Sequence, residues 1–288
     1  MIPKFTLNNG VRVPAIGLGT YLAKDGDEAY RTVMDALSVD CCSIDTAMYY
    51  FNEVSIGQAI RDSGMPREKV YITTKLWNDS HGFEKTLKAF DASLKRLGLD
   101  YIDEYLIHWP NLDEEYIPTW KAFEKLYRDG LIRVIGLSNF PKLTLMNLMQ
   151  HCEIKPMVNQ IEVNPVFQPD DLIDFCQQND ILVEAWRPIV WGKLDKEPIL
   201  SIAAKYGKTP VQVALRWLYQ RGIRTLPKTT HKERMIENMQ IFDFTLSSDD
   251  MAGISKLNTW IRTGESPDEF LFMGEEMIAQ QRALGYPC

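Results

Sequence analysis

The chain has 288 residues, of which 45% are hydrophobic and 25% are charged. This composition supports a large folded core and argues against a disordered chain. Asp and Glu number 39 against 32 Lys and Arg, a net charge of −7, which excludes charge-driven binding to nucleic acid or to anionic membranes as the main function.

The five cysteines indicate a chain that keeps its thiols reduced. Their number is odd and none has the C-x-x-C spacing of zinc and redox sites, so we expect no disulfide framework and no metal. No basic segment followed by an apolar stretch occurs at the start of the chain. No run of about 18 apolar residues occurs anywhere in it. We therefore expect a cytoplasmic protein with neither a membrane nor a nucleic-acid partner.

Eight short apolar segments predict β-strands. They are rich in β-branched and bulky residues and show little alternation, which is typical of strands that are buried on both faces of a parallel sheet. In chain order the expected strands are residues 15–18, 42–45, 70–74, 102–108, 134–137, 157–161, 181–185 and 223–226.

Amphipathic segments lie between the expected strands. In residues 84–97, Leu87, Phe90 and Leu94 recur at helical spacing, and Gly98 ends the pattern. The same periodicity predicts helices at residues 116–127, 143–151, 170–179, 211–221 and 232–241.

This alternation predicts an α/β fold, a single (β/α)₈ barrel of the TIM type that spans residues 1–288 as one domain. An open doubly wound sheet is the alternative. It is less favoured because Gly17 and Gly19 lack the third glycine of a dinucleotide-binding turn, position 22 being leucine. Residues 4–13 predict a hairpin that turns at Asn9-Gly10. Residues 260–288 predict a loop-rich C-terminal tail.

Four side chains with useful chemistry follow consecutive expected strands. Asp45 ends the second strand and Tyr50 lies in the next loop, while Lys75 follows the third strand and His108 ends the fourth. The carboxyl ends of barrel strands meet on the face that carries the active site. Each residue alone is more often a cap, a packing residue or a solvated charge. The four together on one face indicate catalysis.

The combination suits the reduction of a carbonyl group. A tyrosine with a pKa near 10 is a poor acid or base at neutral pH. We expect the Lys75 ammonium to favour the phenolate and lower the pKa of Tyr50, with Asp45 holding the lysine in place. His108 would orient a carbonyl oxygen. The hydride has to come from a cofactor, because no side chain supplies one.

The sequence resembles the aldo-keto reductases over almost its whole length. Residues 45–53 are similar to the family's D-T-A-x-x-Y-x-N-E segment, and residues 72–77 and 105–110 resemble its lysine and histidine segments. The resemblance implies that Asp45, Tyr50, Lys75 and His108 form the catalytic tetrad. It also implies an NADPH-dependent enzyme that reduces aldehydes or ketones to alcohols, with Tyr50 as the general acid.

The resemblance extends to cofactor ligands. The residues implied are Ser138, Asn139 and Gln160 at the nicotinamide carboxamide, and Lys228, Thr229, Arg234, Glu237 and Asn238 at the adenosine end. Two cations and a hydroxyl (Lys228, Arg234 and Thr229) suit a 2′-phosphate, which favours NADPH over NADH. The start of the helix expected at residues 232–241 would also face this anion.

Some positions depart from the family pattern. Trp186 and Arg187 stand where the family usually has tyrosine and serine. Trp186 offers a face on which nicotinamide can stack. Arg187 would contact the cofactor pyrophosphate or a substrate anion, or else pair with an acid at the rim. Glu104 replaces an apolar residue usual in that strand, and the sequence provides no reason for it.

The resemblance suggests Tyr21, Trp77 and Trp109 as walls of the substrate pocket, with residues 111–118 and 260–288 as variable walls. It also favours a monomer whose partner is a small carbonyl compound. Two other functions stay open: an NADP-binding regulatory or structural protein with little turnover, and a phosphate-binding barrel isomerase or lyase. The second would use Lys228 and Arg234 for a sugar phosphate and would not bind nicotinamide.

Overall fold

A computed structural model describes residues 2–110 and 114–267 of the chain. Parts of two expected pocket walls, residues 111–113 of the loop and 268–288 of the tail, lie outside the described residues.

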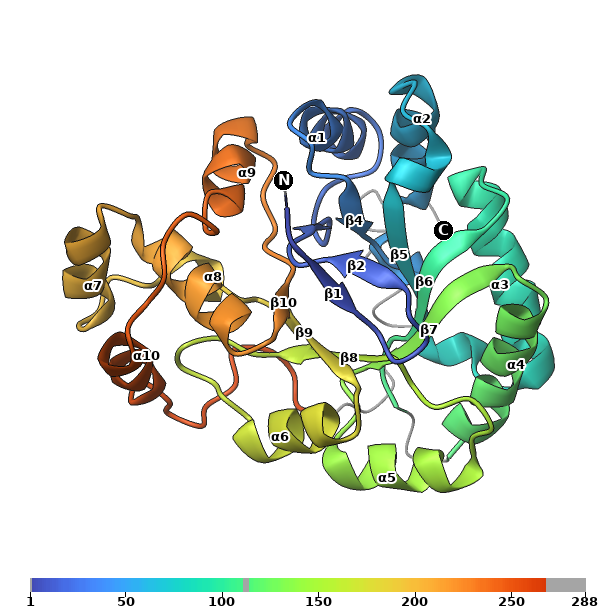
Figure 1. Ribbon diagram of the computed structural model, residues 1–288. Coiled ribbons are helices and arrows are strands. Elements are labelled where there is room, and N and C mark those ends of the chain that lie inside the picture. Colours follow the sequence, from blue (N-terminus) through green and yellow to red (C-terminus); the bar gives the residue numbers. More distant parts are fainter. Residues whose placement is uncertain (1, 111–113, 268–288) are drawn as a thin grey trace.

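A parallel eight-stranded sheet forms the centre of the molecule (Figure 1). Its strands follow one another in chain order, so each strand pairs with the next one along the sequence. The strands are β3 (Leu18–Gly19), β4 (Ser43–Asp45), β5 (Tyr71–Leu76), β6 (Ile102–Ile107), β7 (Ile132–Ser138), β8 (Val158–Glu162), β9 (Leu182–Trp186) and β10 (Arg224–Thr225).

The first and last strands meet and close the barrel. The backbone N–H of Gly17 donates to the carbonyl of Thr225 at 3.0 Å, and that of Gly19 donates to the carbonyl of Pro227 at 3.1 Å. A Cβ on Gly17 would lie 3.0 Å from Cδ2 of Leu226, and one on Gly19 would lie 3.1 Å from the carbonyl oxygen of Leu226, which follows β10. The Gly17-Leu-Gly19 segment therefore allows strands to approach closely at the closure, which is a different use from the dinucleotide turn. The prediction of a (β/α)₈ barrel is confirmed.

Helices surround the sheet and connect its strands (Figure 1). They are α1 (Asp27–Ser38), α2 (Glu53–Asp62), α3 (Phe83–Leu97), α4 (Tyr116–Arg128), α5 (Lys142–His151), α6 (Asp170–Gln178), α7 (Ile199–Tyr206), α8 (Pro210–Gln220), α9 (Lys232–Met239) and α10 (Ser248–Ser255). Those expected from periodicity are present within two residues at either end. The sequence interpretation did not place α1, α2, α7 or α10. Among the described residues, no helix combines the length and apolar composition needed to cross a bilayer.

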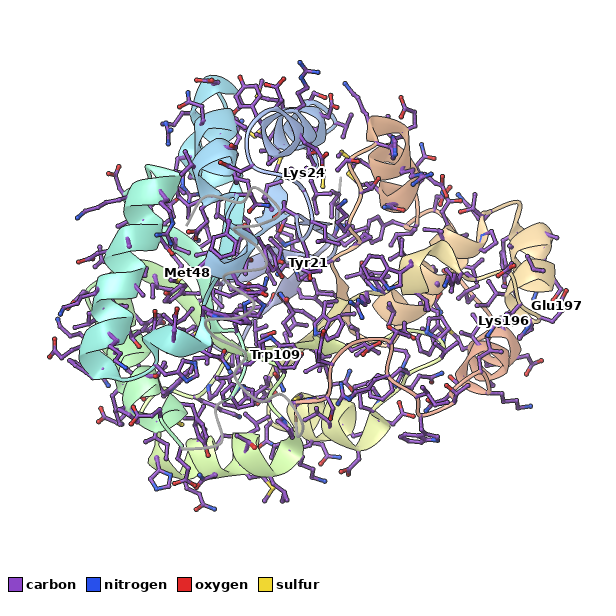
Figure 2. All side chains as sticks on the ribbon, turned by 180° about the vertical axis from the view of Figure 1, so that it is seen from behind. Tyr21, Lys24, Met48, Trp109, Lys196 and Glu197 are labelled. Atoms are coloured by element: carbon purple, nitrogen blue, oxygen red, sulfur yellow. The ribbon has the colours of Figure 1, made fainter. Side chains whose placement is uncertain are left out.

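The predicted N-terminal hairpin is present and covers one mouth of the barrel (Figure 1). Strands β1 (Lys4–Thr6) and β2 (Arg12–Pro14) pair antiparallel, with Gly10 at a φ of +84° in the connection. The side chain of Asn9 donates to the carbonyl of Arg133 at 3.0 Å, which ties the turn to the barrel. With this mouth covered, ligands reach the strands from the opposite face. Figure 2 shows that face, with Tyr21 and Trp109 near its centre.

Candidate active site

Lys75 is the centre of the polar cluster at the carboxyl ends of the strands. Its ammonium is fully buried, 2.6 Å from Oδ1 of Asp45 and 3.0 Å from the carbonyl of Thr46. It also donates to the hydroxyl of Tyr50 at 3.4 Å. Strands β4 and β5 are neighbours, so their last inward-facing residues bring the acid and the amine together. The expected grouping of Asp45, Tyr50 and Lys75 is present.

Tyr50 ends the short helix η1 (Met48–Tyr50), which follows β4 directly. Burial raises the pKa of Tyr50 to about 12, and Asp45 adds to the effect, while Lys75 acts in the opposite direction. Lys75 acts on this pKa in the expected direction, but the net pKa lies above the ordinary value, because the cost of burying a phenolate exceeds the attraction of the ammonium. The phenol is protonated at neutral pH, which suits a proton donor.

His108 lies beside these groups at the end of β6. Burial, with a smaller contribution from Lys75, lowers its pKa well below the ordinary value. The imidazole is therefore neutral at pH 7. Its ring meets the rings of Tyr50 and Trp77 edge-on, at centroid distances of 5.7 and 5.1 Å. A neutral imidazole can donate one hydrogen bond to a carbonyl oxygen without adding a charge.

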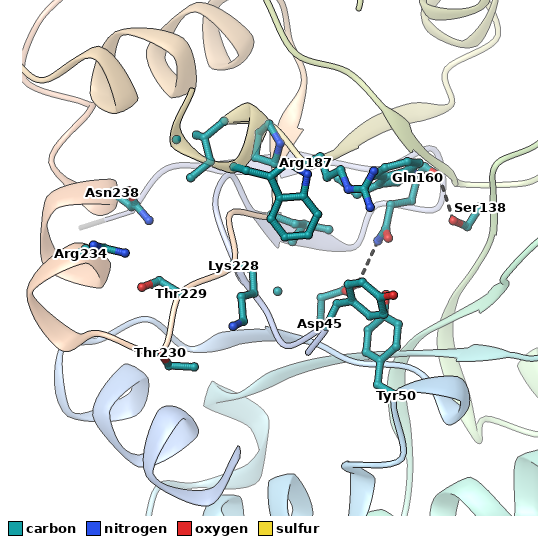
Figure 3. Close-up of a pocket in the computed structure, with 18 of the residues that line it drawn as sticks. Asp45, Tyr50, Ser138, Gln160, Arg187, Lys228, Thr229, Thr230, Arg234 and Asn238 are labelled. Carbon is teal, nitrogen blue, oxygen red and sulfur yellow. Dashed lines mark hydrogen bonds between the residues drawn. The ribbon is translucent and has the colours of Figure 1, made fainter. Parts of the chain in front are cut away.

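Ser138, Asn139 and Gln160 lie together at the ends of β7 and β8, as the resemblance implied. The Ser138 hydroxyl donates to the carbonyl of Gln160 at 3.0 Å (Figure 3). The Asn139 amide nitrogen donates to Ser138 Oγ and to the carbonyl of His108, each at 3.0 Å. These contacts fix the orientation of the side chains. They leave a rotatable hydroxyl and amide oxygens that could meet a carboxamide.

Trp186 ends β9, and its indole nitrogen donates to Oδ1 of Asn139 at 2.9 Å. The hydrogen bond holds the ring at the cavity wall, where it offers a flat face for stacking. Arg187, the next residue, lies against the rings of Trp186 and Trp191 and donates to the carbonyl of Thr263. Of the two expected roles of Arg187, the rim ion pair is not found: within residues 2–110 and 114–267 it pairs with no acid. Arg187 also lines the cavity, so contact with the cofactor pyrophosphate or a substrate anion stays a prediction.

The adenosine end of the expected site lies between β10 and α9 (Figure 3). Lys228 and Arg234 form no ion pair within the part of the chain that the structure describes. Partial burial lowers the pKa of Lys228 because it disfavours the charged ammonium. An anionic partner would stabilise this ammonium. Thr229 and Asn238 are buried nearby. Glu237 also lines the cavity, but its carboxylate accepts a hydrogen bond from Thr209 at 2.6 Å.

Aromatic rings form the other end of the cavity. Trp77 and Trp109 are buried there, as expected, and the exposed Tyr21 packs against Tyr50 with a centroid distance of 5.1 Å. The sequence interpretation missed Tyr49, which stacks on Trp77 with centroids 3.8 Å apart. It also missed Trp191, whose only signal was its place in the loop after β9.

One cavity of about 650 Å³ connects the two ends of the site. It extends from Asp45, Tyr50 and His108, past Ser138 and Gln160, to Lys228, Arg234 and Asn238. A wall for stacking, hydrogen-bonding groups for a carboxamide and cations for a phosphate therefore occur in that order along one cavity. The residues present fit a nicotinamide dinucleotide phosphate whose nicotinamide end is next to Tyr50.

Comparison with known proteins agrees with this arrangement. The model of the Aldo/keto reductase family matches residues 15–259. Glyoxal reductase of Bacillus subtilis is 49% identical over 267 residues, which covers 92% of this chain and 96% of the relative. The 9,11-endoperoxide prostaglandin H2 reductase of Trypanosoma cruzi is 47% identical over 275 residues, or 94% of this chain and 97% of the relative.

Solved structures have the same fold. The aldo-keto reductase MGS-M4, from a Medee basin deep-sea metagenome library, matches with a TM-score of 0.90 and 44% identity over 93% of this chain and 99% of its own. A Bombyx mori aldo-keto reductase in complex with NADP matches with a TM-score of 0.87 and 36% identity, over 93% and 96% of the two chains. The chain belongs to the aldo/keto reductase family and is an NADP(H)-dependent oxidoreductase that reduces carbonyl groups.

Proposed function

We propose that Tyr50 is the proton donor of this reductase and that Asp45, Lys75 and His108 prepare it. NADPH, when bound, supplies the hydride. The carbonyl oxygen then gains negative charge and takes a proton from the nearest acid. Tyr50 suits this role because its phenol is protonated at neutral pH and Lys75 Nζ lies 3.4 Å from its oxygen. The ammonium stabilises the phenolate left after proton transfer.

His108 orients the carbonyl in this proposal. Its neutral ring lies edge-on to Tyr50, so an oxygen between the two groups would receive hydrogen bonds from both. Such donors stabilise the charge that develops on the oxygen during reduction. The observation that carries the proposal is the contact sequence Asp45–Lys75–Tyr50, with Lys75 and Asp45 buried, beside a neutral His108.

We propose small, uncharged aldehydes and 2-oxoaldehydes as substrates. The cavity next to Tyr50 is walled by the rings of Tyr49, Trp77 and Trp109, and such a surface favours compact, apolar or weakly polar compounds. Among the relatives, one is named glyoxal reductase, and a 38% identical Escherichia coli protein is named methylglyoxal reductase DkgA. Absorbance at 340 nm with glyoxal, methylglyoxal and larger ketones tests the choice, and faster turnover of the larger ketones would contradict it.

We also propose that residues 1–288 act as one domain, as a monomer, in the cytoplasm. The four cysteines in the described residues are free thiols, which suits a reducing compartment. Light scattering after size-exclusion chromatography tests the oligomeric state. The alternative of a binding protein with little turnover is not favoured, because the relatives are named reductases. An isomerase or lyase is not favoured either, since the chain belongs to a reductase family.

A further inference from the structure

A charged cluster fills the interior of the barrel below the active site. Arg224, Glu104 and Glu184 point inward from β10, β6 and β9, and all three side chains are completely buried. Nη1 of Arg224 pairs with Glu184 and lies 3.3 Å from Oε2 of Glu104. Its other nitrogens donate to Ser43 Oγ at 2.5 Å and to the carbonyl of Pro14 at 2.9 Å. Such a cluster costs desolvation energy that apolar residues would avoid.

Gln160 links this cluster to Asp45. Its amide nitrogen donates to Oε2 of Glu184 at 3.0 Å and to Oδ2 of Asp45 at 2.9 Å. Figure 3 shows the second of these bonds, with Asp45 and Gln160 facing one another across the cavity wall. A continuous path of hydrogen bonds and ion pairs therefore runs from Arg224 through Glu184, Gln160 and Asp45 to Lys75.

The two carboxylates decide which way the Gln160 amide points. An amide has one NH₂ group with two donors and one carbonyl oxygen, and a carboxylate can only accept. Since Glu184 and Asp45 use both donors, the oxygen of Gln160 is the atom left for a ligand. A nicotinamide carboxamide has an NH₂ group of its own, so this orientation suits it, and the reversed amide would repel it.

We propose that Glu184 and Arg224 are positioning residues of the reductase, which hold Gln160 with its amide nitrogen on Asp45 and thereby fix the Asp45–Lys75–Tyr50 contacts. The inference rests on the proposed roles of Asp45, Lys75 and Tyr50. It also explains Glu104, which the sequence left without a reason. Glu104 is the second carboxylate on Arg224 and accepts a hydrogen bond from the hydroxyl of Tyr71 at 2.7 Å, so it helps hold the guanidinium in place.

Glu184→Gln is the direct test, because it keeps the shape of the side chain. A glutamine at this position offers one oxygen and one NH₂ group where the carboxylate offers two oxygens. Whichever way it turns, its NH₂ group faces either Arg224 or the amide nitrogen of Gln160. We expect kcat to fall at least tenfold and the Kd for NADPH to rise, with tryptophan fluorescence reporting the binding.

The pH profile separates positioning from a loss of packing. The groups that face Glu184 and its partners are Arg224, Glu104, Tyr71 and Asp45. Asp45 raises the pKa of Tyr50 and Lys75 lowers it. When Asp45 is no longer held on Lys75, the Lys75 ammonium lowers the pKa of Tyr50 more strongly. The basic limb of the kcat/KM profile for reduction, where Tyr50 loses its proton, then moves to lower pH in Glu184→Gln.

Asp103→Asn is the matched control. Asp103 precedes Glu104 on β6, is equally buried and pairs with Arg67 and Arg133, but it lies away from Gln160. We expect this variant to lose thermal stability while its basic limb stays in place. Glu184→Asp is a second variant for the case that Glu184→Gln does not fold. It keeps the charge, but its shorter side chain reaches less far toward Gln160. We expect the changes in kcat, NADPH affinity and the basic limb to have the same direction and to be smaller.

The inference is overturned if a folded Glu184 variant keeps the kcat, NADPH affinity and basic limb of the parent. It is equally overturned if Asp103→Asn moves the limb by the same amount. An active Tyr50→Phe enzyme would instead contradict the proposed function itself, so the two failures are distinguishable.

Discussion

Lys75 and Asp45 form an ion pair that is almost completely shielded from water, with Nζ of Lys75 2.6 Å from Oδ1 of Asp45. The ammonium also bonds to the carbonyl of Thr46 and to Tyr50. Buried charges cost free energy unless each has partners. Each member of the pair therefore depends on the other, and we expect disruption of the pair to affect both stability and catalysis.

Removal of Lys75 alone is expected to destabilise the protein strongly. Lys75→Met leaves the Asp45 carboxylate buried without its cation, and breaking a buried pair in this way costs about 3–5 kcal/mol. Urea unfolding measures the loss. In the double variant Asp45→Asn/Lys75→Met no charge is left uncompensated, so we expect part of the stability to return. A double variant that is less stable than Lys75→Met would contradict the argument.

Tyr50→Phe is expected to lower kcat by about 10²–10⁴-fold, the usual contribution of a general acid. The substitution removes only the hydroxyl, and the phenyl ring can keep its contacts with His108 and Tyr21. NADPH binding should therefore stay close to that of the parent. Activity is measured at 340 nm and binding by tryptophan fluorescence. A variant that fails to bind NADPH would show that Tyr50 has a structural role instead.

The cations at the far end of the cavity are expected to determine the choice between NADPH and NADH. Lys228 and Arg234 line the cavity, and a hydrogen bond to a charged group contributes about 1.5–3 kcal/mol. Lys228→Ala and Arg234→Ala should each raise the Kd for NADPH at least tenfold and leave that for NADH nearly unchanged. Equal losses for both nucleotides would show that the residues do not contact the 2′-phosphate.

The sequence was sufficient to predict those parts of the site that depend on the order of the strands along the chain. Asp45, Lys75 and His108 follow consecutive strands, and neighbouring parallel strands bring such residues to one face of a barrel. The pKa of Tyr50 was not predictable, because it depends on how much solvent the folded chain removes from the phenol. Burial of this kind arises from many distant residues and leaves no local pattern.

Contacts between distant segments could not be predicted from the sequence either. Arg224 lies 120 positions from Glu104 and 181 from Ser43, and a lone arginine or glutamate in a strand carries no sign of its partner. Arg187 is a similar case. Its guanidinium binds the carbonyl of Thr263, which the carboxylate of Glu162 holds through the Thr263 backbone N–H at 2.8 Å. Only the folded backbone places residue 263 beside β8 and β9.

Asp250 is expected to make stability depend on pH. Its carboxylate accepts hydrogen bonds from Lys205, Tyr206 and Ser247, which lower its pKa below the ordinary value. The stability gained is fully present above the ordinary pKa of about 4 and is lost as pH falls below it. Thermal unfolding should therefore show a large difference between the parent and Asp250→Asn at pH 7 that shrinks toward pH 3.

The control for Asp250 is Asp171→Asn. Asp171 is largely exposed and pairs with Lys142 on the surface, so its contribution is about 0–1 kcal/mol. Its effect should be small at every pH. An Asp250→Asn difference that stays constant from pH 7 to pH 3 would show that the carboxylate acts through packing and not through its charge.

Two helical glycines are expected to respond to alanine in opposite directions. A Cβ on Gly57 in α2 would lie 2.0 Å from the carbonyl oxygen of Leu97, at the end of α3, so Gly57→Ala has to push two helices apart. Overpacking of this kind costs about 1–3 kcal/mol. A Cβ on Gly253 in α10 would meet Pro198 at 3.4 Å, an ordinary contact. There alanine should add about 0.5–1 kcal/mol, because it restricts the unfolded chain more than glycine does. Urea unfolding of both variants measures the difference, and equal stabilities would mean that α2 and α3 can separate without cost.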